Sequence, residues 1–341
     1  MHRRLPAEWE PQDGVLLAWP HADSDWRDNL ASVEAVFVQI ARHISRFERL
    51  LIVAPAIEPV WQQLDRAGVD PGRVSLYRMA TNDTWARDFG PITIREGEAP
   101  VLLDFGFNAW GLKFAADLDN QITGILARLG AFGRSEARIP GLILEGGSIE
   151  SDGCGTLLTT SQCLLSPNRN PHLDRQGLEQ TLGGVLGASR FLWLENGFLA
   201  GDDTDAHIDT LARFCSEDTI AYVRCDAPTD EHFAALTAME TELRGFRTAK
   251  GHPYRLVPLP WPEPCSGTDG HRLPATYANF LLINGAVLVP TYNVPQDAEA
   301  LAILATVFPD RETIGIDCRP LIAQHGSLHC VTMQIPRGVL P

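Results

Sequence analysis

The sequence predicts an α/β fold organised as one domain over residues 1–341. Short apolar runs typical of β-strands recur from one end of the chain to the other, and stretches with helical periodicity lie between them. No linker rich in serine, glycine or proline and no block of like charge divides the chain. Because strands and helices interleave throughout, one α/β domain is favoured over separate domains.

The strands are expected where apolar residues run together. VLLAW, LLIVA, PVLLDF, FLLI and AVLVP are such runs, and LHCVTMQI alternates apolar and polar residues. Alternation with a period of two is typical of a half-buried strand. The expected strands are 15–19, 50–54, 100–105, 280–283, 286–290 and 328–335.

The helices are expected where apolar residues recur every three or four positions, as Val33, Val36 and Ile40 do within 31–47. Another helix is expected to begin with Asn170 as its N-cap and Pro171 at its first helical position. The spacing of the helices hints at a repeated strand-helix unit, although no residue signature repeats. The other expected helices are 58–67, 117–129, 230–244 and 296–308.

The charge balance makes some classes of binding partner less favourable than others. The chain has 28 lysine and arginine residues against 43 aspartate and glutamate residues, which gives a formal net charge of −15. An acidic surface disfavours binding to nucleic acid and to anionic membranes. The balance is compatible with a small cationic substrate, and it also favours solubility.

The cysteines and the N-terminal segment point to a reducing compartment. There are seven cysteines, and no two have CxxC spacing, so we expect neither a zinc ribbon nor a disulfide framework. The basic start MHRR has no apolar segment behind it and is not expected to be a signal peptide. No apolar run is long enough for a transmembrane helix. We therefore expect a cytoplasmic protein with Cys330 as a free thiol.

Two segments place carboxylates beside glycine turns. In TNDTWARDFGPI, Asp88 and Trp85 precede a Gly-Pro turn, and a carboxylate beside an aromatic ring can hold a cation. In LILEGGSIE, Glu145 leaves an apolar run and is followed by Gly146 and Gly147, which let the backbone pass close to another group. Either carboxylate could instead be structural, capping a turn or a bulge.

Two further segments place an imidazole and a thiol. In DDTDAHIDTLARF, His207 and Asp209 would share a face if the segment were a strand, and together they would form an acid–base pair. In LHCVTMQI, the expected strand puts His329 and Cys330 on opposite faces, so His329 is not expected to be the partner of Cys330. The alternatives are a core histidine and a small buried thiol.

Taken together, the four segments supply the groups needed to attack a planar cation. Two carboxylates can hold a guanidinium through paired hydrogen bonds. A thiolate can add to its central carbon, and an imidazole can protonate the departing ammonia and then activate water. This chemistry requires no metal and no cofactor.

At these residues the sequence resembles the agmatine deiminase family, which belongs to the guanidine-group-modifying enzymes together with arginine deiminases and bacterial peptidylarginine deiminases. The resemblance covers nearly the whole chain. It rests on six segments in the same order: LPAEWEPQDGVLLAWPH, TNDTWARDFGPI, LEGGSIESDGCGTLLTT, CLLSPNRNP, DDTDAHIDTLARF and GSLHCVTMQIP.

The resemblance implies a five-bladed, pseudosymmetric α/β propeller of the pentein type, with the active site at its centre. It implies that the protein hydrolyses agmatine to N-carbamoylputrescine and ammonia, a reaction of polyamine metabolism and putrescine biosynthesis, and it favours a small homo-oligomer. Cys330 matches the nucleophile that forms a covalent amidino-cysteine intermediate, and His207 matches the general acid/base. Glu145 matches the carboxylate next to that histidine.

The resemblance also implies how the substrate is bound. Asp88 and Asp209 match the carboxylates that hold the guanidinium, and Trp85 matches an aromatic residue of the substrate channel. An amine-tailed substrate needs a further acceptor at its distal end, whereas an α-carboxylate would need an arginine or lysine. The candidates for the distal acceptor are Asp202, Asp203 and Asp205.

Three positions depart from the usual pattern of agmatine deiminases, and they put the substrate more in doubt than the reaction. Ala206 replaces a glycine, Ser327 an asparagine and Met333 a glutamine. The alternatives to agmatine deimination are another guanidine or peptidylarginine deiminase, and a guanidine-binding or polyamine-binding protein without turnover. A metallohydrolase is a further alternative, whose ligands would be His207, Asp209, Asp88 and Glu145.

Overall fold

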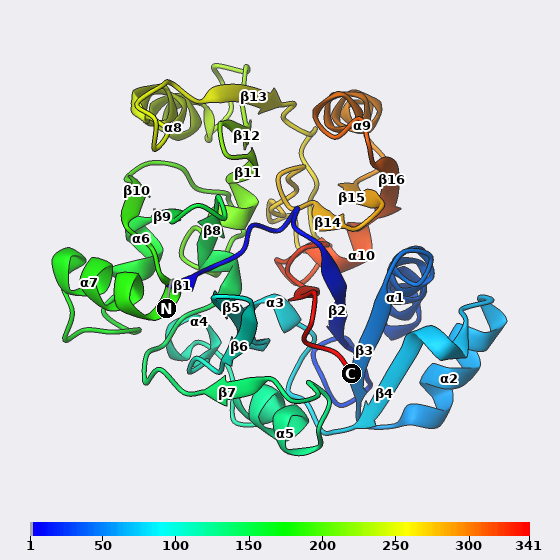
Figure 1. The fold of residues 1–341 in the computed structure, drawn as a ribbon. Helices are drawn as coiled ribbons and strands as arrows, with labels where there is room; N and C mark the ends of the chain where they lie inside the picture. Colours follow the sequence, from blue (N-terminus) through cyan, green and yellow to red (C-terminus); the bar gives the residue numbers. More distant parts are fainter. Residues whose placement is uncertain (1–2) are drawn as a thin grey trace.

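The protein, described over residues 3–341 by a computed structural model, has an α/β fold built from several small mixed sheets. Five sheets of three or four strands occur in this part of the chain. Figure 1 shows the sheets around the middle of the molecule and the longer helices at its outside. These helices are α1 (Leu30–Ile44), α2 (Ile57–Arg66), α5 (Ile122–Arg128), α7 (Arg175–Leu186), α8 (Phe233–Gly245) and α9 (Gln296–Val307).

The strand order of each sheet is as follows. The first sheet is β17 (Met333–Pro336), β2 (Gln12–Ala18), β3 (Arg49–Ala54) and β4 (Val74–Arg78). The second is β1 (Arg3–Arg4), β5 (Ile92–Glu96), β6 (Ala99–Leu103) and β7 (Glu136–Arg138). The third is β10 (Arg190–Leu194), β9 (Thr156–Thr160) and β8 (Ile149–Ser151). The fourth is β11 (Ala212–Ser216), β12 (Thr219–Val223) and β13 (Arg255–Leu259), and the fifth is β14 (Leu281–Ile283), β15 (Ala286–Thr291) and β16 (Glu312–Asp317).

All five sheets contain the same pairing pattern. An antiparallel pair is followed by a parallel pair, as in β11–β12 and β12–β13. A parallel pair requires a crossover connection, and a helix supplies it in each sheet. In the first sheet the antiparallel partner of β2 is β17, which comes from the far end of the chain. The helix spacing suggested a repeated strand-helix unit. The structure has such a repeat in the pairing of its strands, although the repeats share no sequence signature.

The core forms because the apolar faces of the helices pack against apolar strands. Val33, Phe37, Ile40 and Ile44 of α1 are fully buried, and so are the central residues of β3. Each such side chain contributes roughly 1.5–3 kcal/mol when it leaves water. The predicted strands and helices lie where the structure has them, apart from two segments described below and a helix at 117–129 that is shorter than predicted. That helix consists of η2 (Asp119–Gln121) followed by α5.

Short helical elements lie in the connecting segments, and two of them contain the predicted site residues Asp88 and Asp209. These elements are α3 (Ala86–Phe89), α4 (Ala109–Leu112), α6 (Ser161–Leu164), α10 (Arg319–Ile322), η1 (Pro71–Arg73), η3 (Gly146–Ser148) and η4 (Ile208–Thr210). Within residues 3–341, no helix combines the length and the apolar character needed to cross a membrane.

The predicted strand over 328–335 is wrong in its first half. Only β17 (Met333–Pro336) is a strand, and residues 328–331 form a turn. Thr332 closes the turn, because its hydroxyl donates to the carbonyl oxygens of Leu328 and His329 and its backbone N–H also donates to His329. Such side-chain bonds compete with strand pairing. The argument that His329 and Cys330 lie on opposite faces of a strand therefore does not hold.

The predicted helix start at Asn170 is also wrong. The side-chain amide of Asn170 bonds instead to the backbone N–H and carbonyl of Ile143. Helix α7 begins at Arg175, and its N-cap is Asp174, whose carboxylate accepts from the backbone N–H of Gly177 at 2.8 Å.

We expect Asp174→Ala to lower the free energy of unfolding by about 1 kcal/mol, because it removes this cap. Asp174→Ser retains a capping oxygen and should stay within a few tenths of a kcal/mol of the parent. Urea denaturation of both variants checks this, and equal losses in the two would contradict the assignment of Asp174 as the cap.

Candidate active site

A cavity of about 840 Å³ opens beside the short helix α3 and reaches Cys330. Its lining runs from the exposed Asp23 and Asp25 to the buried Asp88 and Cys330, so the thiol lies at the inner end. Six aspartates line the cavity, and no lysine or arginine is among the described residues around it. Trp85 and three other aromatic side chains form much of the remaining wall. The cavity therefore suits a cation with an apolar stem.

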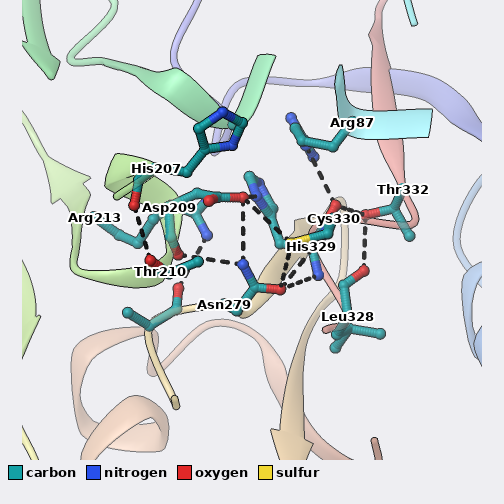
Figure 2. Close-up of polar contacts among 12 residues, drawn as sticks. Arg87, His207, Asp209, Thr210, Arg213, Asn279, Leu328, His329, Cys330 and Thr332 are labelled. Carbon is teal, nitrogen blue, oxygen red and sulfur yellow. Dashed lines mark hydrogen bonds and ion pairs between the residues drawn. The ribbon is translucent and has the colours of Figure 1, made fainter. Parts of the chain in front are cut away.

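The thiol of Cys330 lies between an amide and a carboxylate. Its sulfur is 3.5 Å from Oδ1 of Asn279 and 4.0 Å from Oδ2 of Asp209. The backbone N–H of His329 also donates to Asn279 Oδ1 at 2.8 Å, which holds the turn that carries Cys330 (Figure 2). Burial, followed by the charges of Asp209 and Asp88, raises the pKa of Cys330 well above its ordinary value. In the unliganded site Cys330 is therefore a thiol.

Asp209 is fully buried and has one carboxylate oxygen free. Oδ2 accepts from Nδ1 of His329 at 2.7 Å and from Nδ2 of Asn279 at 3.3 Å, whereas Oδ1 has no hydrogen-bond partner. Burial raises the pKa of Asp209, but the hydrogen bond and charge of His329 outweigh it, so the net pKa is lowered. A buried carboxylate oxygen without a hydrogen-bond donor is costly, and a bound guanidinium would supply such a donor.

His207 and Asp88 meet where Gly147 leaves space for them. Nδ1 of His207 is 3.7 Å from Oδ1 of Asp88, and that oxygen also accepts from the backbone N–H of Gly147 at 2.9 Å. A Cβ atom on Gly147 would lie 2.6 Å from His207 Nδ1 and 2.9 Å from Asp88 Oδ1. The sequence predicted that the glycine pair lets the backbone pass close to another group. At Gly147 the groups that lie close are the imidazole of His207 and the carboxylate of Asp88.

The protonation states follow from these contacts. Burial lowers the pKa of His207, but the charges of Asp88 and Cys163 outweigh it and raise the pKa to about 10. Burial raises the pKa of Asp88 to about 6, against the opposing charge of His207. At neutral pH the pair is therefore an imidazolium beside a carboxylate.

Glu145 lies near His207, and its charge is balanced by an arginine that the sequence did not single out. Arg169 donates from Nε to both oxygens of Glu145 at 2.9 and 3.0 Å, and both side chains are fully buried. The same arginine donates to Asp205 and to the carbonyl of Thr204. It therefore ties the chain just before His207 to the carboxylate beside it.

The segment of His207 and Asp209 is not a strand, which was the condition for the two side chains to share a face by period two, yet the two residues do lie together. His207 is the N-cap of η4 and Asp209 lies within this short 3₁₀ helix. Both side chains face Gly147, whose missing Cβ atom would meet both of them. The two residues share a space because of the turn rather than because of a period of two.

Trp85 lines the cavity as predicted, and two glycine-containing segments fit around it. The ring fills the place where a side chain on Gly326 would lie. Trp110 packs against Trp85 with 6.4 Å between ring centroids and donates its indole N–H to Asp88 Oδ2 at 2.9 Å. Residues 109–112 all have positive φ, a conformation that is uncommon for residues other than glycine. This backbone turns Trp110 toward Asp88.

The three candidates for a distal acceptor lie in different surroundings. Asp202 accepts hydrogen bonds from the loop residues Thr204 and Ala206, and Asp205 is paired with Arg169 and Lys113. Asp203 alone among the three lines the cavity. Burial, and then the charge of Asp202, raises the pKa of Asp203.

The predicted set of four metal ligands is not the one that the structure brings together. Among residues 3–341, two other trios have donor atoms close enough to share an ion: Glu145, Cys163 and His207, and Glu8, Glu150 and His329. Their carboxylates already accept from Arg169 or Arg213. The donor chemistry thus favours ion pairs at both places.

Asn279 and Arg169 are two of the contact residues that the sequence reasoning missed. Asn279 stands just before a strand in an apolar segment, where nothing distinguishes it from a turn residue. Arg169 does lie in CLLSPNRNP, one of the segments that carried the resemblance, and a buried Glu145 required a cation somewhere in the chain.

Comparison with known proteins places the chain in a family. The model of the Porphyromonas-type peptidyl-arginine deiminases matches residues 4–336. The chain belongs to this family. Agmatine deiminase of Pseudomonas aeruginosa (strain LESB58) is 35% identical over an alignment of 356 residues, which covers 98% of this chain and 95% of the relative.

Two solved structures of relatives have nearly the same fold. A Porphyromonas gingivalis protein provisionally called an arginine deiminase is 52% identical and has a TM-score of 0.94, covering 99% of this chain and 100% of that one. A cysteine-to-serine variant of C. jejuni agmatine deiminase with substrate bound is 38% identical and has a TM-score of 0.92, covering 99% of this chain and 97% of that one.

The departures from the usual agmatine deiminase pattern lie outside the lining of the cavity. Ser327 is buried and its hydroxyl meets that of Tyr292 at 3.0 Å, and Met333 packs beside Gly90 and Gly146. Ala206 has φ +62°, the left-handed conformation in which glycine is the least strained residue. The glycine that agmatine deiminases usually have at this position would therefore lower the strain of the backbone. Its replacement by Ala206 does not alter the cavity wall.

Gly147→Ala should abolish activity while leaving most of the fold intact, because the new methyl group would push apart His207 and Asp88. We expect turnover of a guanidine substrate to fall by about 100-fold or more, the effect of a misplacement of about 1 Å. Steady-state kinetics beside circular dichroism measures this. Gly184→Ala, at a glycine with no atom within 4 Å of the added Cβ, is the matched control and should keep parental activity.

Proposed function

We propose that the protein hydrolyses agmatine to N-carbamoylputrescine and ammonia. One observation carries the proposal: a cavity with six aspartates and no lysine or arginine ends at a thiol flanked by two carboxylates. Such a cavity repels the α-carboxylate of arginine and accepts a dication. The agmatine deiminases among the relatives support the same substrate.

Asp88 and Asp209 bind the guanidinium in this proposal. The free Oδ1 of Asp209 takes one N–H, and Asp88, which already accepts from Gly147 and Trp110, takes another. Trp85 lies along the stem of the substrate. The central carbon is then held near the sulfur of Cys330.

The first chemical step forms a covalent intermediate. Arrival of the cation offsets the charges of Asp88 and Asp209, which had raised the pKa of Cys330, so the thiol loses its proton more readily, and the proton passes to solvent through the open cavity. The thiolate sulfur forms a bond to the guanidinium carbon. Imidazolium His207 then gives a proton to one terminal nitrogen, the carbon–nitrogen bond breaks and ammonia leaves. An amidino-cysteine remains.

The second step hydrolyses that intermediate. Neutral His207, held beside Asp88 and Glu145, takes a proton from a water molecule whose oxygen bonds to the amidino carbon. The carbon–sulfur bond then breaks, and the electron pair returns to the sulfur of Cys330. The products are a urea, N-carbamoylputrescine, and one ammonia per substrate.

Asp203 is the residue that we propose for the distal amine of agmatine, since it lines the cavity and its two acidic neighbours have structural partners. The runner-up, a deiminase of peptidylarginine, would need room and a counter-charge for a peptide carboxylate or backbone. The acidic lining disfavours a free carboxylate.

The repeated pairing pattern supports a finer description of the fold. We propose that the five sheets are the blades of a pseudosymmetric propeller of the pentein type and that residues 1–341 form one catalytic domain. Pairing of β17 with β2 and of β1 with β5 joins both ends of the chain to this arrangement. A small homo-oligomer and a cytoplasmic location remain predictions from the sequence.

Cys330→Ala should abolish ammonia release from agmatine, because no other group replaces the nucleophile. Agmatine, arginine and an arginyl peptide are assayed in parallel, with Cys154→Ala as the control for an exposed thiol outside the cavity. Agmatine turnover by the parent and by Cys154→Ala, but not by Cys330→Ala, is the expected result. Preferred turnover of the arginyl peptide would overturn the substrate, and an active Cys330→Ala would overturn the mechanism.

Asp203→Asn should raise the KM for agmatine by about tenfold or more, because a charge-assisted hydrogen bond contributes roughly 1.5–3 kcal/mol. Butylguanidine, which lacks the distal amine, should show the same KM with the parent and the variant. An equal change for both substrates would mean that Asp203 does not contact the amine.

A further inference from the structure

The side chain of His329 is held at both ring nitrogens by carboxylates. Nδ1 is 2.7 Å from Oδ2 of Asp209, and Nε2 is 2.7 Å from Oε2 of Glu8. All three side chains are buried. Figure 2 shows the ring between the turn of Cys330 and the η4 segment of Asp209. His329 therefore links the active site to Glu8, in the segment between β1 and β2 that crosses the middle of the molecule (Figure 1).

Two such contacts require two protons on the unit formed by Glu8, His329 and Asp209. A neutral imidazole has one N–H and one lone pair, so it can satisfy only one carboxylate. The lone pair of the other nitrogen would face a carboxylate oxygen at 2.7 Å, which is repulsive. An imidazolium donates to both carboxylates and removes the conflict.

The charges around the ring are balanced by this second proton. Glu8 also accepts from Arg213 at 2.8 Å and from the backbone N–H of Leu282, and Arg213 pairs in addition with Glu150. Arg87 lies 3.9 Å from Glu8. Three carboxyl groups and two guanidinium groups surround the ring. Burial raises the pKa of one of them, Glu150, to about 7, and with all three carboxyl groups ionised an imidazolium brings the buried group to neutrality. Burial and the two arginines outweigh Glu8 and Asp209 and lower the pKa of His329, so the imidazolium is inferred from the two short contacts to carboxylates and not from this shift.

We propose that His329 is a positioning residue, which as an imidazolium anchored by Glu8 orients the Asp209 carboxylate toward substrate and toward Cys330. The ring holds Oδ2 of Asp209, the oxygen that lies 4.0 Å from the sulfur of Cys330, and Oδ1 has no partner among the described residues. Without the Nδ1 donor, the carboxylate is free to rotate, since Asn279 offers it only a longer bond of 3.3 Å. This inference rests on the proposed role of Asp209 in binding the guanidinium.

A pair of substitutions tests the roles of the two ring nitrogens of His329 separately. The amide nitrogen of asparagine lies near the position of Nδ1, and that of glutamine near the position of Nε2. His329→Asn therefore keeps a donor for Asp209, and His329→Gln keeps one for Glu8. We expect kcat/KM for agmatine to fall by about 100-fold in His329→Gln and by tenfold or less in His329→Asn, with both variants folded by circular dichroism. Equal losses, or the reverse order, would overturn the positioning role.

A second measurement does not depend on activity, and its decisive arm uses the parent protein. In the parent protein labelled with ¹⁵N-histidine, the His329 ring should show two protonated nitrogens at pH 7, and Glu8→Gln, which keeps the shape but removes the charge, should show one. A neutral His329 ring in the parent would overturn the inference. Absence of agmatine turnover by the parent would instead overturn the proposed function, while the ¹⁵N spectrum would still report on the ring.

Discussion

The constraint on which the active site depends is the burial of several carboxylates close together, away from water. An unpaired buried carboxylate costs several kcal/mol, so each one requires its own compensation. Glu145 has Arg169, Glu8 has Arg213, and Asp209 has His329. Asp88 has only neutral donors and a histidine that carries a proton. Asp88 is thus the least fully compensated of these carboxylates, and a bound cation would stabilise it.

The compensating groups come from separate connecting segments, and the fold brings them together. Short elements such as α3, η3, α4 and η4 project side chains toward the centre, while the sheets and outer helices supply the apolar burial (Figure 1). Glycines at the crossing points allow the backbones to approach, as Gly147 shows with His207 and Asp88. The rigid surroundings fix the distances between thiol, imidazole and carboxylates, and a solvent-exposed loop could not do this.

The sequence singled out candidate site residues that the structure places close together, but it predicted the local structure around them less well. Apolar periodicity located α1, α8, α9 and the strands β2 and β3, because these elements bury one face or both. It failed at 328–331 and at His207, where hydrogen bonds from Thr332 and the cap of η4 decide the backbone. Asn279 and Glu8 could not be predicted from local patterns, since their partners are far away in the sequence. The resemblance over six segments indicated the candidate site residues, which periodicity could not do.

The contact between Glu8 and His329 joins residues that are 321 positions apart in the chain. Contacts of such separation form late in folding, because the entropy of closing so long a loop must be overcome before they stabilise anything. The last event in folding is therefore expected to be the pairing of β17 with β2, and the catalytic geometry should appear only with it. A partly folded chain would retain most of its helices and yet have no deiminase activity. Activity therefore reports on the pairing of β17 with β2 more sharply than helix content does.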